Sequence, residues 1–206
     1  MPVAAVARCL SLVVLVSAPV CALAIEAAPS TEQANAAYRR SLDAELRREG
    51  AKATPSPMVQ TLLESMKIAA VQGCQGIDPE RTACIVELDS PMGDGYEAYR
   101  FRRDGADWQI VEEQDTPPPQ PDIAQVQALL RAHLTELAGQ QKAPKDEAEF
   151  RAFASSLTVT ALESCQLDRD TGALECDAQL HTPGQGKGSK PLRFELKDAT
   201  WSLLPD

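Results

Sequence analysis

Two short motifs in the second half of the chain have the letters of known active or binding sites. Asp170-Thr171-Gly172 has the triplet of aspartic proteases, whose chemistry needs two carboxylates sharing one proton across a symmetric cleft. The corresponding segment Asp78-Pro79-Glu80 lacks this triplet, so we predict only a tight turn in which Gly172 supplies a positive φ. Gly186-Lys187-Gly188-Ser189 looks like a phosphate-binding loop, but no glycine precedes it at the required spacing and Lys187 is not followed by Ser or Thr. Neither motif predicts chemistry.

Metal-ligating and nucleophilic arrangements are also missing from the sequence pattern. His133 and His181 are the two histidines, and neither is set among the residues of a zinc site or a catalytic triad. Asp168 and Asp170 offer two oxygen ligands, but the other ligands of a calcium loop are absent. We therefore predict no catalytic residue, no metal and no cofactor.

The N-terminal segment has the composition of a secretory signal peptide. Residues 9–25 carry no charge, follow Arg8, and include Ala22-Leu23-Ala24, which fits the small-x-small rule for cleavage. We predict a signal peptide over residues 1–24 and a periplasmic or secreted bacterial protein. The alternatives are a retained membrane anchor, for which the run is short against the roughly 20 residues of a span, and a lipoprotein at Cys21, which a bulky preceding residue disfavours.

The charge of the chain excludes one class of partner. Cleavage would remove one arginine and no acid, which changes the net charge from −10 to −11. Binding to nucleic acid depends on clustered Lys and Arg side chains that neutralise phosphates, so a nucleic-acid partner is not expected. The acidic excess keeps a secreted protein soluble and leaves a basic protein partner open.

The chain contains an internal duplication. Cys-Gln, an Asp-rich turn and a second Cys occur in both halves, and each copy continues with Arg-Phe and then Trp. The offsets are 91 residues for Cys74 and Cys165, 92 for Cys84 and Cys176, and 93 for Trp108 and Trp201. Because the two tryptophans occupy matching positions, we predict that both pack in a core; the alternative is an aromatic pair displayed for a carbohydrate or a partner.

A proline-rich segment separates the two copies. Residues 117–121 cannot continue a helix or a central strand, so they predict a stiff, extended linker between unit one (25–116) and unit two (122–206). Capping boxes at Ser30 and Asp122 predict a first helix in each unit, and apolar spacing predicts a second, shorter helix after it. Alternation and turn residues predict four strands per unit, at 67–75, 83–89, 96–103 and 107–112, and at 157–166, 173–181, 190–197 and 200–204.

The predicted fold class is therefore α+β, with two tandem units that each pack helices on one side of a four-stranded antiparallel meander. The cysteines of each unit fall on neighbouring strands, which predicts disulfides Cys74–Cys84 and Cys165–Cys176 among the three possible pairings. Seven residues on the predicted outer faces of the strands are candidate contact residues: Arg100, Arg102, Asp177, Gln179, His181, Arg193 and Lys197.

This arrangement resembles the secreted β-lactamase inhibitory proteins, on the evidence of the two cysteine pairs and the aromatic strand Tyr96-Glu97-Ala98-Tyr99-Arg100-Phe101. In that family two sheets form a concave surface that clamps another protein, so the resemblance implies a binding role. If the second helix of each unit were a loop, a cystatin-like or nuclear-transport-factor-like unit would fit equally well.

The sequence thus favours a non-enzymatic binding protein of the cell envelope or exterior, such as an inhibitor or immunity-type factor, with a protein partner and no stable membrane span after cleavage. A small-ligand carrier with a pocket between helix and sheet is the alternative. A hydrolase whose residues assemble only in the fold is the third hypothesis.

Overall fold

The computed structural model describes residues 28–50, 56–111, 117–141, 143–184 and 186–205; the predicted signal peptide and its cleavage site lie outside them. Within these residues the chain forms four helices and two four-stranded antiparallel sheets, which confirms the predicted α+β class. The elements of the first unit are α1 (Thr31–Gly50), α2 (Pro57–Ser65), β1 (Lys67–Gly76), β2 (Arg81–Asp89), β3 (Gly95–Asp104) and β4 (Asp107–Ile110). Those of the second are α3 (Ile123–Gly139), α4 (Pro144–Ser156), β5 (Thr158–Leu167), β6 (Leu174–Thr182), β7 (Gly186–Lys197) and β8 (Thr200–Leu203).

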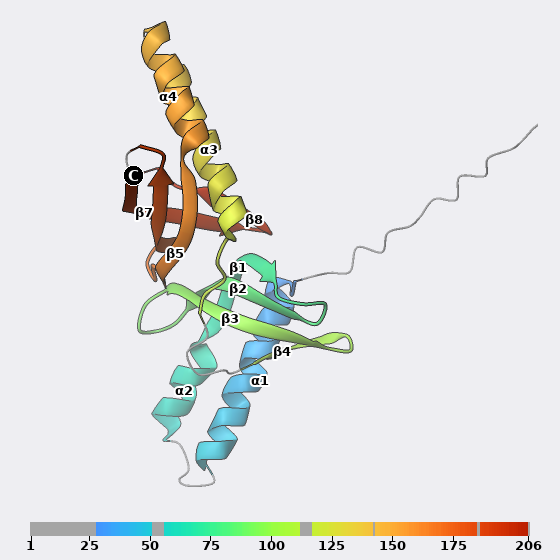
Figure 1. The fold of residues 1–206 in the computed structure, drawn as a ribbon. Coiled ribbons are helices and arrows are strands. Elements are labelled where there is room, and N and C mark those ends of the chain that lie inside the picture. The colour runs from blue at the N-terminus through green and yellow to red at the C-terminus, as the bar shows by residue number, and fades with distance from the viewer. Residues whose placement is uncertain (1–27, 51–55, 112–116, 142, 185, 206) are drawn as a thin grey trace, which may run out of the picture.

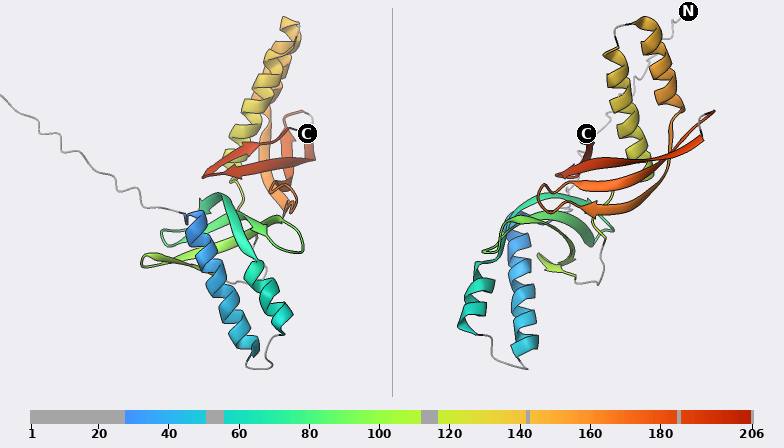
Figure 2. Two further views of the ribbon diagram at one scale, coloured as in Figure 1. Left: turned by 180° about the vertical axis from the view of Figure 1, so that it is seen from behind. Right: turned by 90° about the vertical axis from the view of Figure 1, so that its left-hand side faces the viewer.

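Both sheets are simple meanders, in the strand orders β1-β2-β3-β4 and β5-β6-β7-β8. The two sheets lie next to each other at the centre of the molecule, and a helix pair extends from each in opposite directions (Figure 1 and Figure 2). The structure has the disulfides that the repeat predicts, with S–S distances of 2.06 Å for Cys74–Cys84 and 2.10 Å for Cys165–Cys176. Each links the two strands of the first hairpin in its unit.

Each unit has its own apolar core between its first helix and the inner face of its sheet. In unit one, Tyr38 of α1 packs with Phe101 and Trp108, and in unit two the corresponding side chains include Phe194 and Trp201. Trp108 is 3% exposed and Trp201 6%, which confirms the predicted packing role of the matched tryptophans. The remaining strand residues alternate between this core and the outer face, as a pleated strand requires.

The first helices begin where their capping residues predict. The Ser30 hydroxyl accepts from the Gln33 N–H at 3.2 Å, and the Asp122 carboxylate accepts from the Gln125 N–H at 2.7 Å. Such caps satisfy N–H groups that have no partner inside the helix. The second helix of each unit buries fewer side chains than the inner strands do. In α2 no residue is buried and Met58 is 83% exposed, and in α4 the buried residue is Ala154.

Three details differ from the sequence-based expectation. The β6–β7 hairpin of unit two is tighter than the predicted strands 173–181 and 190–197 imply, because Thr182 pairs with Gly186, so Gly186-Lys187-Gly188-Ser189 lies in β7 rather than in a loop. The apolar spacing of Ile123, Val126 and Leu130 predicts that they share one face of the first helix of unit two, but Ile123 is 46% exposed because it begins the helix ahead of the core residues. The 117–121 linker is irregular as expected, but Pro119 and Pro121 are buried against the protein.

Candidate binding surface

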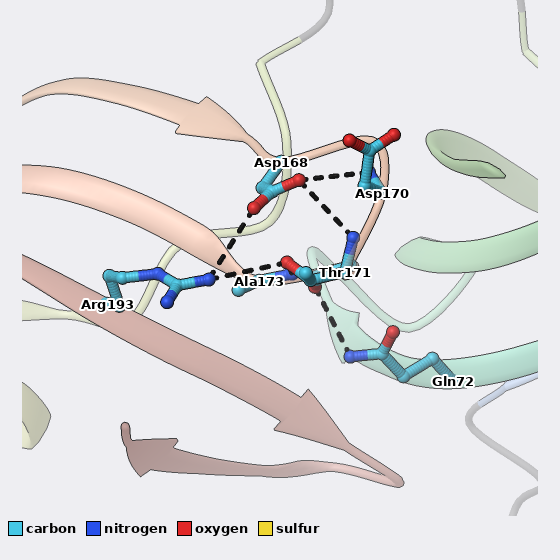
Figure 3. A network of polar contacts seen from close by, with 7 residues as sticks. Gln72, Asp168, Asp170, Thr171, Ala173 and Arg193 are labelled. Atoms are coloured by element: carbon cyan, nitrogen blue, oxygen red, sulfur yellow. Dashed lines mark hydrogen bonds and ion pairs between the residues drawn. The ribbon is translucent and has the colours of Figure 1, made fainter. Parts of the chain in front are cut away.

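The turn between β5 and β6 is organised by the carboxylate of Asp168 (Figure 3). Its Oδ1 accepts hydrogen bonds from the backbone N–H groups of Asp170, at 2.9 Å, and Thr171, at 3.3 Å. Gly172 has φ 69°, so this Asp-Thr-Gly triplet is the tight turn that the sequence predicts. Hydrogen bonding by the Thr171 side chain, followed by the Asp170 amide, lowers the pKa of Asp168 below its ordinary value of 3.8.

Arg193 on β7 braces the same turn. Its Nη2 donates to Asp168 Oδ2 and to the Thr171 hydroxyl, each at 3.5 Å (Figure 3). Asp78 organises the β1–β2 turn of unit one in the same way, since its Oδ1 accepts from the N–H groups of Glu80 and Arg81. The two turns therefore share one design, which supports their equivalence in the duplication.

The turn of unit two is held against unit one. Gln72 on β1 donates from Nε2 to the carbonyl of Gly172 at 3.3 Å (Figure 3), and the N–H of Tyr96 on β3 donates to the carbonyl of Arg169 at 2.8 Å. Arg169 also forms an ion pair with Glu97. A glycine is required at position 172, because a Cβ there would lie 2.7 Å from the Tyr96 ring.

A second contact joins the β7–β8 turn to β1. The N–H of Cys74 donates to the carbonyl of Asp198 at 2.6 Å, and the N–H of Asp198 donates to the carbonyl of Gln72 at 3.0 Å, which makes a short parallel bridge at Gly73. A Cβ on Gly73 would lie 2.7 Å from the carbonyl oxygen of Leu196, so only glycine allows the backbones to approach this closely. We call these two contacts the junction.

The junction covers part of the outer face of the first sheet. Ile85, on the outer side of β2, is completely buried and belongs to the apolar core of unit two. Ala83, two residues earlier on the same face, is 6% exposed. Strand β2 therefore has apolar side chains on both of its faces, and the second unit packs against the outer one.

The outer face of the second sheet is open and polar. Glu163, Glu175 and Asp177 are exposed there, and Glu163 lies directly opposite Asp177 in the strand register. Ser164 forms a bulge in β5 with φ 52°. A depression of about 310 Å³ lies over this bulge, lined by Ser164, Gln166, Leu167, Asp168, Glu175, Cys176 and Asp177.

The structure divides the seven candidate contact residues between the two sheets. Arg100 and Arg102 lie on β3; Arg100 is half-buried, and Arg102 is exposed and donates to Gln109 Oε1 at 3.3 Å. Five lie on the outer face of the second sheet: Asp177, Gln179, His181, Arg193 and Lys197. The structure therefore brings five of the seven to one surface.

The members of this group differ in their surroundings. Gln179 donates to Glu163 Oε2 at 3.1 Å and to the Ser189 hydroxyl at 3.4 Å, and Asp177 is exposed on the same strand. His181 is half-buried at the end of β6, and its Nδ1 has no hydrogen-bond partner within the described part of the chain. Lys197 is exposed next to the junction turn.

Sequence reasoning missed the junction and the residues around the depression. Two signals were available: β2 reads Thr-Ala-Cys-Ile-Val, apolar on both faces, whereas β6 reads Leu-Glu-Cys-Asp-Ala, with clean alternation. Strands that are apolar on both faces are buried on both faces. A glycine inside a strand pattern, as at Gly73, signals close approach of another backbone.

The surface contains carboxylates, amides, hydroxyls and guanidinium groups, a set that suits hydrogen bonding to a partner. Among the described residues, no group of three or more His, Cys, Asp or Glu side chains could hold a metal ion, and none of the described helices is long and apolar enough to cross a membrane. No protein-family model matches the chain, and no curated protein or solved structure is significantly similar to it.

Proposed function

We propose that this protein is a non-enzymatic binding protein of the periplasm or the cell exterior, of the inhibitor or immunity type, and that it engages its partner with the outer face of the second sheet. The observation that carries the proposal is the asymmetry of the two sheets. The outer face of the first is covered where Ile85 is buried, while the outer face of the second leaves Glu163, Glu175 and Asp177 exposed.

The construction of the molecule supports this role. Each unit has a disulfide, and the junction holds the units together through backbone hydrogen bonds rather than through side chains alone. A preorganised surface loses less conformational entropy when it binds, so a braced sheet face is well suited to recognise another protein. The disulfides fit an oxidising compartment, which agrees with the predicted signal peptide.

Site-specific photo-crosslinking in the organism that makes the protein tests the proposal. A photoreactive residue at Gln179, on the open face, should capture an envelope or secreted protein, and the same residue at Gln60, exposed on α2, should not. The intact mass of the exported protein should equal the mass of a chain that begins at Ile25. Absence of any adduct specific to position 179 would refute the proposed surface, and a chain retained in the cytoplasm would refute the location.

A second candidate function, a carrier of small anionic ligands, is favoured by one observation. A depression of about 350 Å³ lies between α1 and β4, and Arg40, Arg48 and Gln109 are among its lining residues. A thermal-shift screen of small carboxylates and phosphate esters checks this alternative. Stabilisation that disappears in Arg48→Gln would support it, and a flat screen would remove it.

A further inference from the structure

The two units place different residues at one equivalent position of their sheets. The disulfide cysteines align Cys84 with Cys176, so Ala83 and Ile85 of β2 correspond to Glu175 and Asp177 of β6. On β1 and β5, Gln72 and Gly73 correspond to Glu163 and Ser164, and both strands have a register shift there. The depression over the β5 bulge is therefore the counterpart of a defined place on unit one.

In unit one that place is occupied by a segment of protein. The β7–β8 turn lies on it, with backbone hydrogen bonds between Asp198 and the neighbours of Gly73, and the Leu196 main chain packs over Gly73. Ile85, next to it on the same sheet, packs in the apolar core of unit two together with Leu196. The equivalent place thus functions as a receptor for a short backbone segment.

In unit two the same place is open and carries acidic side chains. β5 is an edge strand, and no backbone hydrogen bond from outside the sheet reaches Glu163 or Ser164 within the described residues. Arg193, opposite Glu175 in the register, donates to Asp168 and Thr171 at the neighbouring turn.

Two carboxylates face each other across β5 and β6, and Glu163 accepts a hydrogen bond from the neutral Gln179 side chain. Glu163 and Asp177 are directly opposite each other, and like charges in that position destabilise a sheet. A cation placed over this pair removes the repulsion. Where unit one has the apolar side chains of Ala83 and Ile85, unit two has the hydrogen-bond acceptors Glu175 and Asp177.

We infer that the depression over the β5 bulge is a docking site for an extended, lysine- or arginine-bearing segment of a partner protein. The segment adds to the edge of β5 as the β7–β8 turn adds to β1, and its basic side chains contact Glu163, Glu175 and Asp177. Addition to a strand edge supplies main-chain hydrogen bonds, and the side chains give specificity. The inference rests on the proposed binding function and names the chemistry of the partner.

The probe is a fluorescein-labelled eight-residue peptide of alternating Lys and Thr, titrated with the mature chain and followed by fluorescence anisotropy. β-Branched Thr favours the extended form. The test variant is Glu175→Gln with Asp177→Asn, which keeps side-chain size and removes two charges. The control is Asp43→Asn with Glu45→Gln, the same chemical change on exposed residues of α1.

We expect binding by the wild-type chain, weakening of about fivefold to tenfold in the test variant, and unchanged affinity in the control. A peptide with alternate backbone nitrogens methylated should bind more weakly than the unmodified probe. The inference is overturned if the wild-type chain does not bind the probe. It is also overturned if both double variants weaken binding equally, because the attraction is then not specific to this site. Equal binding of the methylated peptide would show that main-chain hydrogen bonds do not contribute, which also overturns it.

Two further outcomes separate this inference from the proposed function. If the crosslink at Gln179 persists unchanged in the Glu175→Gln, Asp177→Asn variant, the binding function stands and the basic-segment site is wrong. If sedimentation velocity shows self-association that this variant abolishes, the depression binds a second copy of the chain, which also overturns the inference.

Discussion

Replacing Gly73 with alanine tests whether the junction holds the two units together. A Cβ at this position would meet the Leu196 carbonyl oxygen at 2.7 Å and its Cγ at 2.8 Å, distances that a real Cβ does not tolerate. One of the two contacting atoms is backbone, so the β7–β8 turn must move away from β1. The Cys74–Asp198 and Asp198–Gln72 hydrogen bonds are then weakened or lost.

The expected loss follows from these contacts. Two backbone hydrogen bonds contribute about 0.5–1.5 kcal/mol each, while the lower entropy of the unfolded chain in a Gly→Ala change returns about 0.4–1 kcal/mol. The free energy of unfolding of Gly73→Ala should fall by about 1.3 kcal/mol at the middle of these ranges, and by at most about 2.6 kcal/mol, measured by urea denaturation. Hydrogen exchange should show faster exchange at the amides of Cys74 and Asp198.

Gly76→Ala is the matched control for this substitution. Gly76 lies on the same strand, and a Cβ there would meet nothing within 4 Å, so the variant should be neutral or slightly stabilised. If Gly73→Ala and Gly76→Ala unfold at the same urea concentration, with equal exchange at Cys74, the junction does not contribute to stability. The interpretation of the units as one braced body would then be wrong.

Three further perturbations have defined outcomes. Replacing Cys74 and Cys84 with alanine opens a loop of about ten residues and should lower the free energy of unfolding by on the order of 2–3 kcal/mol in urea denaturation. Asp122→Ala removes the cap of α3 and should cost about 0.5–2 kcal/mol, seen in the same assay with reduced helical circular dichroism. Because the pKa of Asp168 is lowered by folding, its stabilisation is present above pH 3.8 and is lost as the pH falls further, so Asp168→Asn should flatten that part of the acid-unfolding curve.

Local patterns predicted most of the elements because local forces determine them. The capping boxes at Ser30 and Asp122 formed as expected, since the residues involved are three apart in the chain. The strand alternation and the duplication together predicted the disulfide pairing, because cysteines at facing positions of one hairpin are close, as Cys74 and Cys84 are in the register. β7 was predicted too short because its first residues are Gly, Lys and Ser, which have low strand preference and are recruited by pairing with β6.

The candidate surface was only partly predictable, since it depends on which faces the other unit covers. The alternation of apolar and polar residues along the strands predicts an outer-face position for both Arg100 and Asp177, and does not distinguish between them. The packing that distinguishes them joins residues over a hundred positions apart, such as Gln72 and Leu196. No local pattern specifies such a contact. The unusual apolar run around Ile85 and the glycine at position 73 indicate that something covers this face, without indicating what.

The contact between the units is made by different surfaces on the two copies, and this has a consequence for binding. Unit two supplies its two turns, and unit one supplies its β1 edge, the outer face of β2 and the start of β3 at Tyr96 and Glu97. Contacts of this kind do not close within a pair, because each unit keeps the complementary surface unused. In unit one the unused surface is the Asp78 turn, and in unit two it is the β5 edge beside the acidic depression.

At this edge of unit two, Glu175 and Asp177 stand where unit one has Ala83 and Ile85. The two carboxylates prevent a further apolar turn from packing there, since burying unpaired carboxylates is costly. This difference between the units leaves an open, acidic surface, as the proposed docking of a cationic segment requires, so the duplication accounts for the location of this open face.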